Sequence, residues 1–319
     1  MTCILLPGND PYFNLACEEY FLTSSGEDVL LLYVNSASVV VGRHQQLYAE
    51  INHAVLRHHA VLPARRITGG GAVFHDRGNL NFSFIATHHL PVNNFREKCT
   101  AAVVRALQKL GLPATAGKRH EISIREQKIS GSASHVFHHR VIHHGTLLFS
   151  SDLDLLNAVL TPLPGYTGKA VSSVRSEVGN IVSYLPHLSF SAFKNEFVSC
   201  LQHDKVISLF RHLKWQEKNN IEKLQRCKYG TWEWIVGVSP SYELSRSVQT
   251  TKGKLSFTLK AEEGIIRSFC FVSSFLPLPA TQSFALALTG KRLEWTTLEE
   301  AVSPFLEGID KEKFLESLF

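Results

Sequence analysis

Residues 65–76 combine two arginines, three consecutive glycines and an apolar segment, in the order Arg-Arg-Ile-Thr-Gly-Gly-Gly-Ala-Val-Phe-His-Asp. Glycine lacks a Cβ, so its backbone can adopt positive φ and approach a ligand closely. Successive backbone N–H groups in such a loop form a concave anion site, and Arg66 adds a fork of donors that matches phosphate or carboxylate. The segment predicts anion capture beside an apolar wall, although the residues alone leave a glycine-rich hairpin turn open.

A second candidate is Lys128, which stands within residues 127–133 (Gln-Lys-Ile-Ser-Gly-Ser-Ala) and precedes residues 143–148 (His-His-Gly-Thr-Leu-Leu). Its small neighbours leave room for a ligand, and its ammonium could stabilise negative charge on acyl or phosphoryl oxygens. A solvated strand lysine is the alternative interpretation, since most lysines are exposed.

These segments resemble the lipoate–protein ligase family, within the larger group of biotin and lipoate ligases. The matching pieces occur in family order through most of the chain, at residues 65–66, 69–76, 79–84, 128–133, 143–148, 173–176 and 229–234. The combination of Arg-Arg-x-x-Gly-Gly-Gly with Lys-Ile-Ser-Gly-Ser-Ala favours lipoate over biotin as the acid.

The resemblance implies an ATP-dependent lipoate–protein ligase with two steps. The carboxylate of lipoate attacks the α-phosphate of ATP, which gives lipoyl-AMP and pyrophosphate. A lysine of a carrier domain then takes the lipoyl group and releases AMP. ATP and Mg²⁺ are therefore expected at the site. The expected partners are carrier domains of 2-oxoacid dehydrogenase E2 subunits and the glycine cleavage H protein.

The resemblance and the residue types together predict the site. Lys128 is the expected catalytic residue and is expected to contact both ATP and lipoate. The other predicted ATP contacts are Arg66, Gly71, Ala72, Val73 and Phe74. The other predicted lipoate contacts are Gly70 and His144, and the residues expected to wall the acyl chain are Val73, Phe74, His144 and Leu147.

Four further residues stand where the family suggests secondary roles. Glu121 is the candidate outer contact for Mg²⁺, where the family more often has Asp, and a dedicated protein metal site is not predicted. The candidates for secondary contacts with the substrates are Arg43, Lys169 and Arg175. Five histidines within residues 135–144 also invite a zinc interpretation, but their spacing does not fit the usual zinc motifs, so exposed histidines on a hairpin are expected instead.

Three other activities remain open from the sequence. One is a lipoyl or octanoyl transferase that uses a preformed acyl donor without ATP. A second is transfer through a cysteine thioester, which needs a thiolate near Lys128, although no cysteine lies between residues 128 and 148. A third is a non-catalytic carrier-binding protein of the same fold, which would be expected to have lost part of the arginine, glycine and lysine set.

Hydrophobic periodicity predicts the elements that must position these residues. A helix is expected to start at Asp10 and Pro11, with Glu18 on the face opposite its apolar residues. Residues 95–110 form the clearest helix. Strands are expected at residues 29–34, 38–42, 72–75 and 81–86, the last two as a pair around a turn. Strands and helices mix without a strict βαβ rhythm, which predicts an α+β fold: a mixed sheet with helices packed on one side.

The chain is expected to form two domains. The catalytic domain should span residues 1–215, and a small α+β accessory domain, which the resemblance links to the activation step, should span residues 225–319. The charged residues 203–226 are interpreted as a linker region. Within the accessory domain, helices are expected at residues 281–288 and 298–319.

Composition limits the remaining possibilities. The 319 residues are 44% hydrophobic with a net charge of +5, which excludes global disorder and is too weakly basic to argue for nucleic acid. Six scattered cysteines indicate a reducing compartment. No membrane span or secretory signal is expected. We expect a cytoplasmic monomer, with the mitochondrial matrix as the alternative. The sequence does not rank lipoate against octanoate, since both fit an apolar tunnel.

Overall fold

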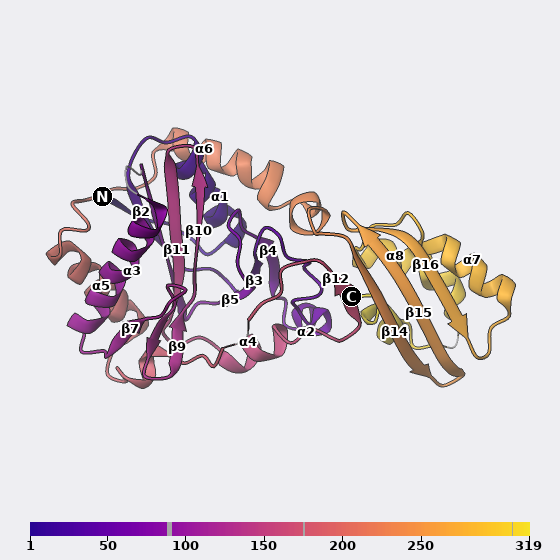
Figure 1. Ribbon diagram of the computed structural model, residues 1–319. Helices are drawn as coiled ribbons and strands as arrows, with labels where there is room; N and C mark the ends of the chain where they lie inside the picture. Colours follow the sequence, from indigo (N-terminus) through magenta and orange to yellow (C-terminus); the bar gives the residue numbers. More distant parts are fainter. Residues whose placement is uncertain (88–90, 175, 308) are drawn as a thin grey trace.

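The computed structural model describes residues 1–87, 91–174, 176–307 and 309–319, which form a larger and a smaller lobe (Figure 1). The C-terminal part of the chain, coloured orange to yellow, makes most of the smaller lobe. No helix in the described ranges is long and apolar enough to cross a membrane.

The centre of the larger lobe is a six-stranded sheet in the order β10-β11-β6-β2-β1-β13. Its strands are β10 (Ser132–Phe137), β11 (Arg140–Leu148), β6 (Asn79–Thr87), β2 (Val29–Tyr33), β1 (Thr2–Leu5) and β13 (Leu209–Phe210). The neighbours from β10 to β2 are antiparallel, whereas β1 runs parallel to both β2 and β13. This confirms the prediction of an α+β fold with a mixed sheet.

Helices cover both faces of this sheet, so the expectation of helices on one side is wrong. The helices are α1 (Pro11–Thr23), α3 (Val92–Lys109) and α5 (Phe190–His203). Val29 and Leu31 enter the apolar cluster that contains α1, whereas Leu30 and Leu32 enter the cluster that contains α3 and α5. Because successive strand residues face opposite sides, a strand that is buried at every position, as β2 is, requires a covering layer on each.

The first helix begins as predicted. The carboxylate of Asp10 accepts hydrogen bonds from the backbone N–H groups of Tyr12 at 2.8 Å and Phe13 at 3.4 Å. Pro11 is the first helical residue, where its missing N–H costs nothing. The predicted helix at residues 95–110 is also present, as α3.

Two three-stranded sheets, in the orders β4-β3-β5 and β7-β8-β9, carry Lys128 and the strands on either side of the glycine loop, whereas His144 lies on β11 of the central sheet. Their strands are β3 (Ser38–Val41), β4 (Leu62–Arg65), β5 (Val73–His75), β7 (Ala114–Ala116), β8 (Ile122–Ile124) and β9 (Gln127–Ser130), and short helices α2 (His53–His58) and α4 (Leu153–Val159) follow β3 and β11.

The predicted pairing of residues 72–75 with 81–86 is wrong, because β5 pairs with β3 while β6 pairs with β2 and β11. Asp76 explains the difference. Its carboxylate accepts from Gly78 N at 2.9 Å and from Asp152 N at 2.7 Å. These bonds tie the turn to the start of α4, so the chain passes from one sheet to another instead of folding back as a hairpin.

The smaller lobe is built on a four-stranded antiparallel sheet in the order β12-β14-β15-β16. Its elements are β12 (Tyr166–Gly168), β14 (Tyr242–Thr250), β15 (Gly253–Glu262), β16 (Ile265–Ser273), α7 (Leu278–Leu288), α8 (Trp295–Val302) and α9 (Lys311–Glu316). The single helix expected at residues 298–319 is wrong. Pro304, in a 3₁₀ turn (Ser303–Phe305), ends α8 because proline cannot continue a helix interior.

The interpretation of residues 203–226 as a linker is also wrong. α5 extends to His203, and α6 (Trp215–Leu224) packs against α1 with Ile221 fully buried. Arg211 joins this helix to the main sheet through Glu217 at 2.8 Å and Glu27 at 2.6 Å. The π-helical segments η2 (Gln225–Tyr229) and η3 (Glu233–Gly237) follow α6 and lead towards β14, and η1 (Ile181–Ser183) precedes α5. The division at residues 1–215 and 225–319 stays a prediction.

Candidate active site

Lys128 is presented by a bulge in β9. Ile129 has no partner residue in the pairing of β9 with β8, and such a bulge changes the direction of the side chains beside it. The backbone of Lys128 also donates to Glu177 O at 3.0 Å and accepts from Gly179 N at 3.0 Å. These bonds hold β9 on the edge that faces away from β8, so the backbone of Lys128 has a fixed position.

The Lys128 ammonium is a partly desolvated cation. In the described part of the chain it has no hydrogen-bond or ion-pair partner. Burial lowers the pKa of Lys128 below its ordinary value, Glu121 opposes that shift, and Arg119 adds to it. A cation held in this way is available for an incoming negative charge.

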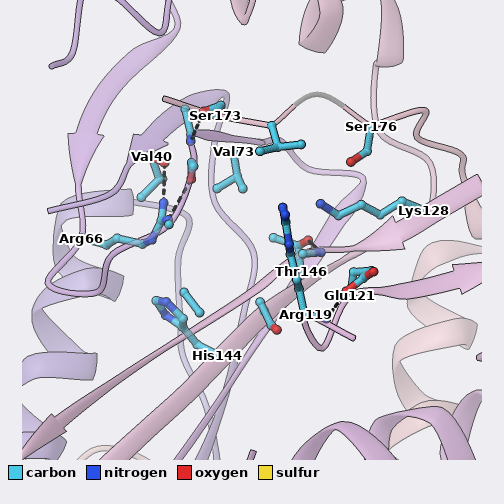
Figure 2. A pocket seen from close by; sticks show the side chains of 18 of the residues that line it. Val40, Arg66, Val73, Arg119, Glu121, Lys128, His144, Thr146, Ser173 and Ser176 are labelled. Carbon is cyan, nitrogen blue, oxygen red and sulfur yellow. Dashed lines mark hydrogen bonds between the residues drawn. The ribbon is translucent and has the colours of Figure 1, made fainter. Parts of the chain in front are cut away.

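A cavity of about 710 Å³ lies in front of this lysine. All three predicted lipoate contacts line it, namely Lys128, Gly70 and His144. Arg66 and residues 71–73, predicted for ATP, line it as well. Figure 2 shows Lys128, Arg119 and Glu121 on one side of the cavity and Arg66, Val40 and His144 on the other. The cavity thus has Lys128 on one side and His144 on the other.

A second cavity, of about 400 Å³, shares part of this wall. Lys128, Ala72 and Val73 line both cavities, whereas Phe74 lines only the second. Leu147, which was expected to wall the acyl chain, is fully buried and lines neither cavity. Lys128 thus stands where the two spaces meet.

Arg66 shapes the glycine loop from inside. It donates to Gly69 O at 2.7 Å and Gly71 O at 2.8 Å, to Thr68 Oγ1 at 2.9 Å, and to a carbonyl of β3. Gly70 between these carbonyls has φ +90°, a conformation that glycine adopts without strain. Burial lowers the pKa of Arg66 to about 10. These contacts establish a role in loop geometry, and the predicted contact of Arg66 with ATP stays a prediction.

His144 belongs to a buried polar network. Its Nδ1 contacts the Glu18 carboxylate at 2.8 Å and its Nε2 contacts Thr68 Oγ1 at 2.9 Å. Glu18 is fully buried and also accepts from Tyr33 OH at 2.8 Å and from Ser83. Burial pushes the pKa of Glu18 up, but His144, Ser83 and Tyr33 together hold it below its ordinary value. Sequence periodicity placed Glu18 opposite the apolar face and missed this role.

Ser173 is a second residue whose role the sequence did not reveal. Its hydroxyl accepts from Ala72 N at 2.8 Å and from Gln45 Nε2 at 3.1 Å, and it donates to Glu50. It therefore attaches residues 172–174, which line both cavities, to the glycine loop. The Ser-Val-Arg-Ser match to the family was the available signal.

The secondary candidates divide. Glu121 lines the larger cavity. Its carboxylate accepts from the backbone N–H of Arg119 at 2.8 Å, and Arg119, which the sequence did not single out, lines the same cavity. Arg43 is exposed and lies over Trp234 at 5.5 Å, outside both cavity walls. Lys169 is also exposed and lines neither cavity, while Arg175 lies outside the described residues.

The histidines of residues 135–144 and the cysteines form neither a metal site nor a thiol site in the described part of the chain. Within the described ranges, no group of three or more His, Cys, Asp or Glu residues is arranged to hold a metal ion. The expectation of exposed histidines is correct for His138 and His139 at the β10–β11 turn. It is wrong for His143 and His144, which are buried. No cysteine lines either cavity in the part of the chain described.

Comparisons with known proteins agree across most of the chain. The family described as "Lipoyl protein ligase A/B catalytic domain" matches residues 10–226, and the family described as "Bacterial lipoate protein ligase C-terminus" matches residues 239–318. Lipoate–protein ligase 1 of Staphylococcus aureus is 35% identical over 301 residues, covering 93% of this chain and 91% of the relative. Lipoate–protein ligase LplJ of Bacillus subtilis is 30% identical, covering 98% of this chain and 97% of the relative.

Solved structures show the same relationship. A putative lipoate protein ligase from Thermoplasma acidophilum with bound lipoic acid has a TM-score of 0.65 at 26% identity, covering 74% of this chain and 99% of its own. Lipoate–protein ligase A bound with ATP has a TM-score of 0.65 at 27% identity, covering 75% and 100%. A bipartite Thermoplasma acidophilum ligase, studied with its E2 lipoyl domain, has a TM-score of 0.64 at 27% identity, covering 74% and 96%.

Proposed function

The chain belongs to the lipoate–protein ligase family, and we propose that it joins lipoate to a lysine of a carrier domain with Lys128 acting in both chemical steps. ATP-dependent ligation follows from the family and from relatives solved with lipoic acid or ATP. The observation that carries the assignment of Lys128 is its position: it lines both cavities with no partner among the described residues.

In the first step, a carboxylate oxygen of lipoate attacks the α-phosphorus of ATP. The bond from this phosphorus to the bridging oxygen breaks, and pyrophosphate leaves. Negative charge gathers on the oxygens around the phosphorus, and a preorganised cation is the main device by which a protein stabilises such charge. Lys128 supplies that cation. Its partial desolvation strengthens the interaction, because effective dielectric screening is weaker away from water.

In the second step, the ε-amine of the carrier lysine attacks the acyl carbon of lipoyl-AMP. The bond from that carbon to the phosphate oxygen breaks, AMP leaves with the electron pair, and the amine loses a proton to solvent. The carbonyl oxygen becomes negative in the transition state, within the charge field of the same Lys128 ammonium. One residue thus serves both steps because both pass through the same acyl group.

The two cavities suit the two substrates. We assign the larger cavity to lipoate, with its carboxylate at the Lys128 end and its chain between Gly70 and His144, and the second cavity, walled by Phe74, to the nucleotide. ATP is used together with Mg²⁺ in this proposal. Mg²⁺ commonly binds phosphates plus one or two carboxylates and keeps several waters. Glu121 lines the larger cavity beside Lys128, where the two cavities meet, and would contact the ion from there. The charge of the ion would offset that of the pyrophosphate.

The partners are proposed from the same family. A relative studied with its E2 lipoyl domain supports an E2 lipoyl domain as the carrier, and we extend the proposal to the glycine cleavage H protein. We also propose that the protein acts as a monomer, with residues 1–215 as the catalytic domain and residues 225–319 as the accessory domain, in the cytoplasm or the mitochondrial matrix.

Intact-mass spectrometry of a carrier tests this function. Purified protein, lipoate and ATP should add one lipoyl group to an E2 lipoyl domain, and none to a carrier whose acceptor lysine is replaced by arginine. The H protein is tested in parallel as a second carrier. If the mass rose only when synthetic lipoyl-AMP replaced lipoate and ATP, the activating half of the proposal would be wrong.

A further inference from the structure

Arg65 is a fully buried arginine without a counter-ion. It is 0% exposed, and no ion pair of its guanidinium is present in the described part of the chain. Burial, together with the neighbouring charge of Arg66, lowers the pKa of Arg65 to about 10. Burying a cation in this way costs free energy unless its hydrogen bonds are satisfied. The hydrogen-bond partners of Arg65 therefore indicate which segments of the chain this residue joins.

Those partners lie on two separate parts of the chain. On one side, Arg65 donates to Gly42 O at 3.0 Å, Arg43 O at 3.3 Å and Gln45 O at 2.7 Å. On the other side lies the segment that leads into the smaller lobe. There Arg65 donates to the carbonyls of Trp234 at 3.1 Å and Ile235 at 2.8 Å and 3.0 Å, and to Ser239 Oγ at 2.8 Å.

The segment leading into the smaller lobe is shaped for this contact. Trp234 and Ile235 lie in η3, a π-helical turn, and such turns are common at functional sites. Their carbonyls point to Arg65 instead of staying within a regular helix. In return, Trp234 Nε1 donates to Arg65 O at 2.8 Å. The connection is therefore reciprocal and buried.

The loop on the other side of Arg65 reaches the candidate active site. Gln45 Oε1 accepts from Gly42 N at 2.9 Å, and its Nε2 donates to Val171 O at 3.3 Å and Ser173 Oγ at 3.1 Å. Ser173 in turn accepts from Ala72 N at 2.8 Å. A continuous series of hydrogen bonds thus runs from the entrance of the smaller lobe to the wall shared by both cavities.

The two adjacent arginines act in opposite directions. Side chains alternate along an extended segment, so Arg65 at the end of β4 turns to η3 while Arg66 turns to the carbonyls of the glycine loop. Arg66 therefore holds the glycine loop directly, through its carbonyls. Arg65 holds the same loop indirectly, through Gln45 and Ser173.

We propose that Arg65 is a positioning residue for the activation step. Through its hydrogen bonds, Arg65 makes the position of the loops that hold ATP depend on the position of residues 234–239. This inference rests on the proposed function. Activation requires these loops to place a triphosphate in line with the lipoate carboxylate, and a small misplacement of reacting groups lowers rates strongly. Transfer from preformed lipoyl-AMP involves no triphosphate and depends less on the same loops.

The test compares the two half-reactions in two variants that weaken the contact from opposite sides. Arg65→Lys keeps the charge but loses the forked donors, and Ser239→Ala removes one acceptor on the smaller-lobe side. The matched control is Ser247→Ala, a serine exposed on β14. Pyrophosphate release with lipoate measures activation, and transfer from synthetic lipoyl-AMP to an E2 lipoyl domain measures the second step. Thermal unfolding is followed for each protein.

The expected result is a separation of the two steps. Arg65→Lys should lower kcat/KM for ATP in activation by roughly 100-fold and Ser239→Ala by roughly tenfold, with transfer reduced no more than about threefold in both. Equal losses in both steps, or unchanged activation in both variants, would overturn the inference. Absence of pyrophosphate release from the unmodified protein would instead overturn the proposed function, and with it this inference.

Discussion

Lys128 gains its importance from position more than from residue type. The bulge in β9 aims it at the place where the two cavities meet, and its pKa is lowered chiefly by burial. The sequence predicted this residue from its small neighbours and from the family resemblance, and the resemblance added Gly70 and His144. Glu18 could not be found in the same way, because its partner His144 lies 126 positions further along the chain.

Replacement of Lys128 by alanine should remove activity without unfolding the protein. We expect pyrophosphate release with lipoate to fall by about 100- to 1000-fold, the loss typical for a preorganised group that stabilises transition-state charge. The matched control is Lys254→Ala, an exposed lysine on β15. A Lys128→Ala protein that lost its cooperative thermal transition would instead point to a structural role for the lysine.

The Glu18 network should make the protein sensitive to acid. The pKa of Glu18 is below the ordinary 4.5 in the folded protein, so its ionised form stabilises the fold. That stabilisation is complete above about pH 4.5, the carboxyl's unfolded value, and is lost as pH falls through the folded pKa. Urea unfolding at a series of pH values should show this loss. Glu18→Gln should reduce this loss of stability at low pH. If the variant kept the same pH dependence, Glu18 would not be its source.

At the scale of elements, the sequence predicted helices from local patterns correctly, but it did not predict which distant strands pair. The Asp10 cap of α1 and the apolar stripe of α3 are properties of a few neighbouring residues. The pairing of β5 with β3, in contrast, depends on bonds between Asp76 and the start of α4, which no local pattern announces. α6 was missed because four of its ten residues are charged, and Ile221 is its one buried apolar residue.

A core substitution tests whether α6 belongs to the folded core. Ile221 is fully buried beside α1, so Ile221→Ala should lower the free energy of unfolding by about 2–5 kcal/mol. Lys218→Ala on the exposed face of α6 is the control, with an expected change within about 0.5 kcal/mol. Urea denaturation measures both. Equal free energies of unfolding for the two variants would mean that α6 is not part of the folded core, as expected of a linker.

At the scale of the whole molecule, contacts between distant segments join the lobes. β12 lies in the sheet of the smaller lobe and pairs with β14 there, although the residues before and after it in sequence belong to the larger lobe. The last residue, Phe319, is buried and stacks on His53 of α2 with ring centroids 4.0 Å apart. Together with the Arg65 contacts, these features place the smaller lobe where it can influence the candidate active site.

The contact at the C-terminal residue should be important for stability. Phe319→Ala removes a buried ring, and we expect the free energy of unfolding to fall by about 3 kcal/mol or more. Leu286→Ala on α7 is the control, because that side chain is 76% exposed. Differential scanning calorimetry should show a lowered transition for Phe319→Ala alone. Matching thermograms for the two variants would mean that the stacked rings do not contribute to joining the lobes.

The most direct test of the central claim is pyrophosphate release from ATP by the purified protein, without any carrier. Lipoate, octanoate and biotin are supplied separately, and each acid is repeated with Lys128→Ala. We expect release with lipoate, none with biotin, and a loss of release in the variant. No release with any of the acids, together with transfer of lipoyl groups from synthetic lipoyl-AMP to an E2 lipoyl domain, would contradict the claim that this site activates lipoate.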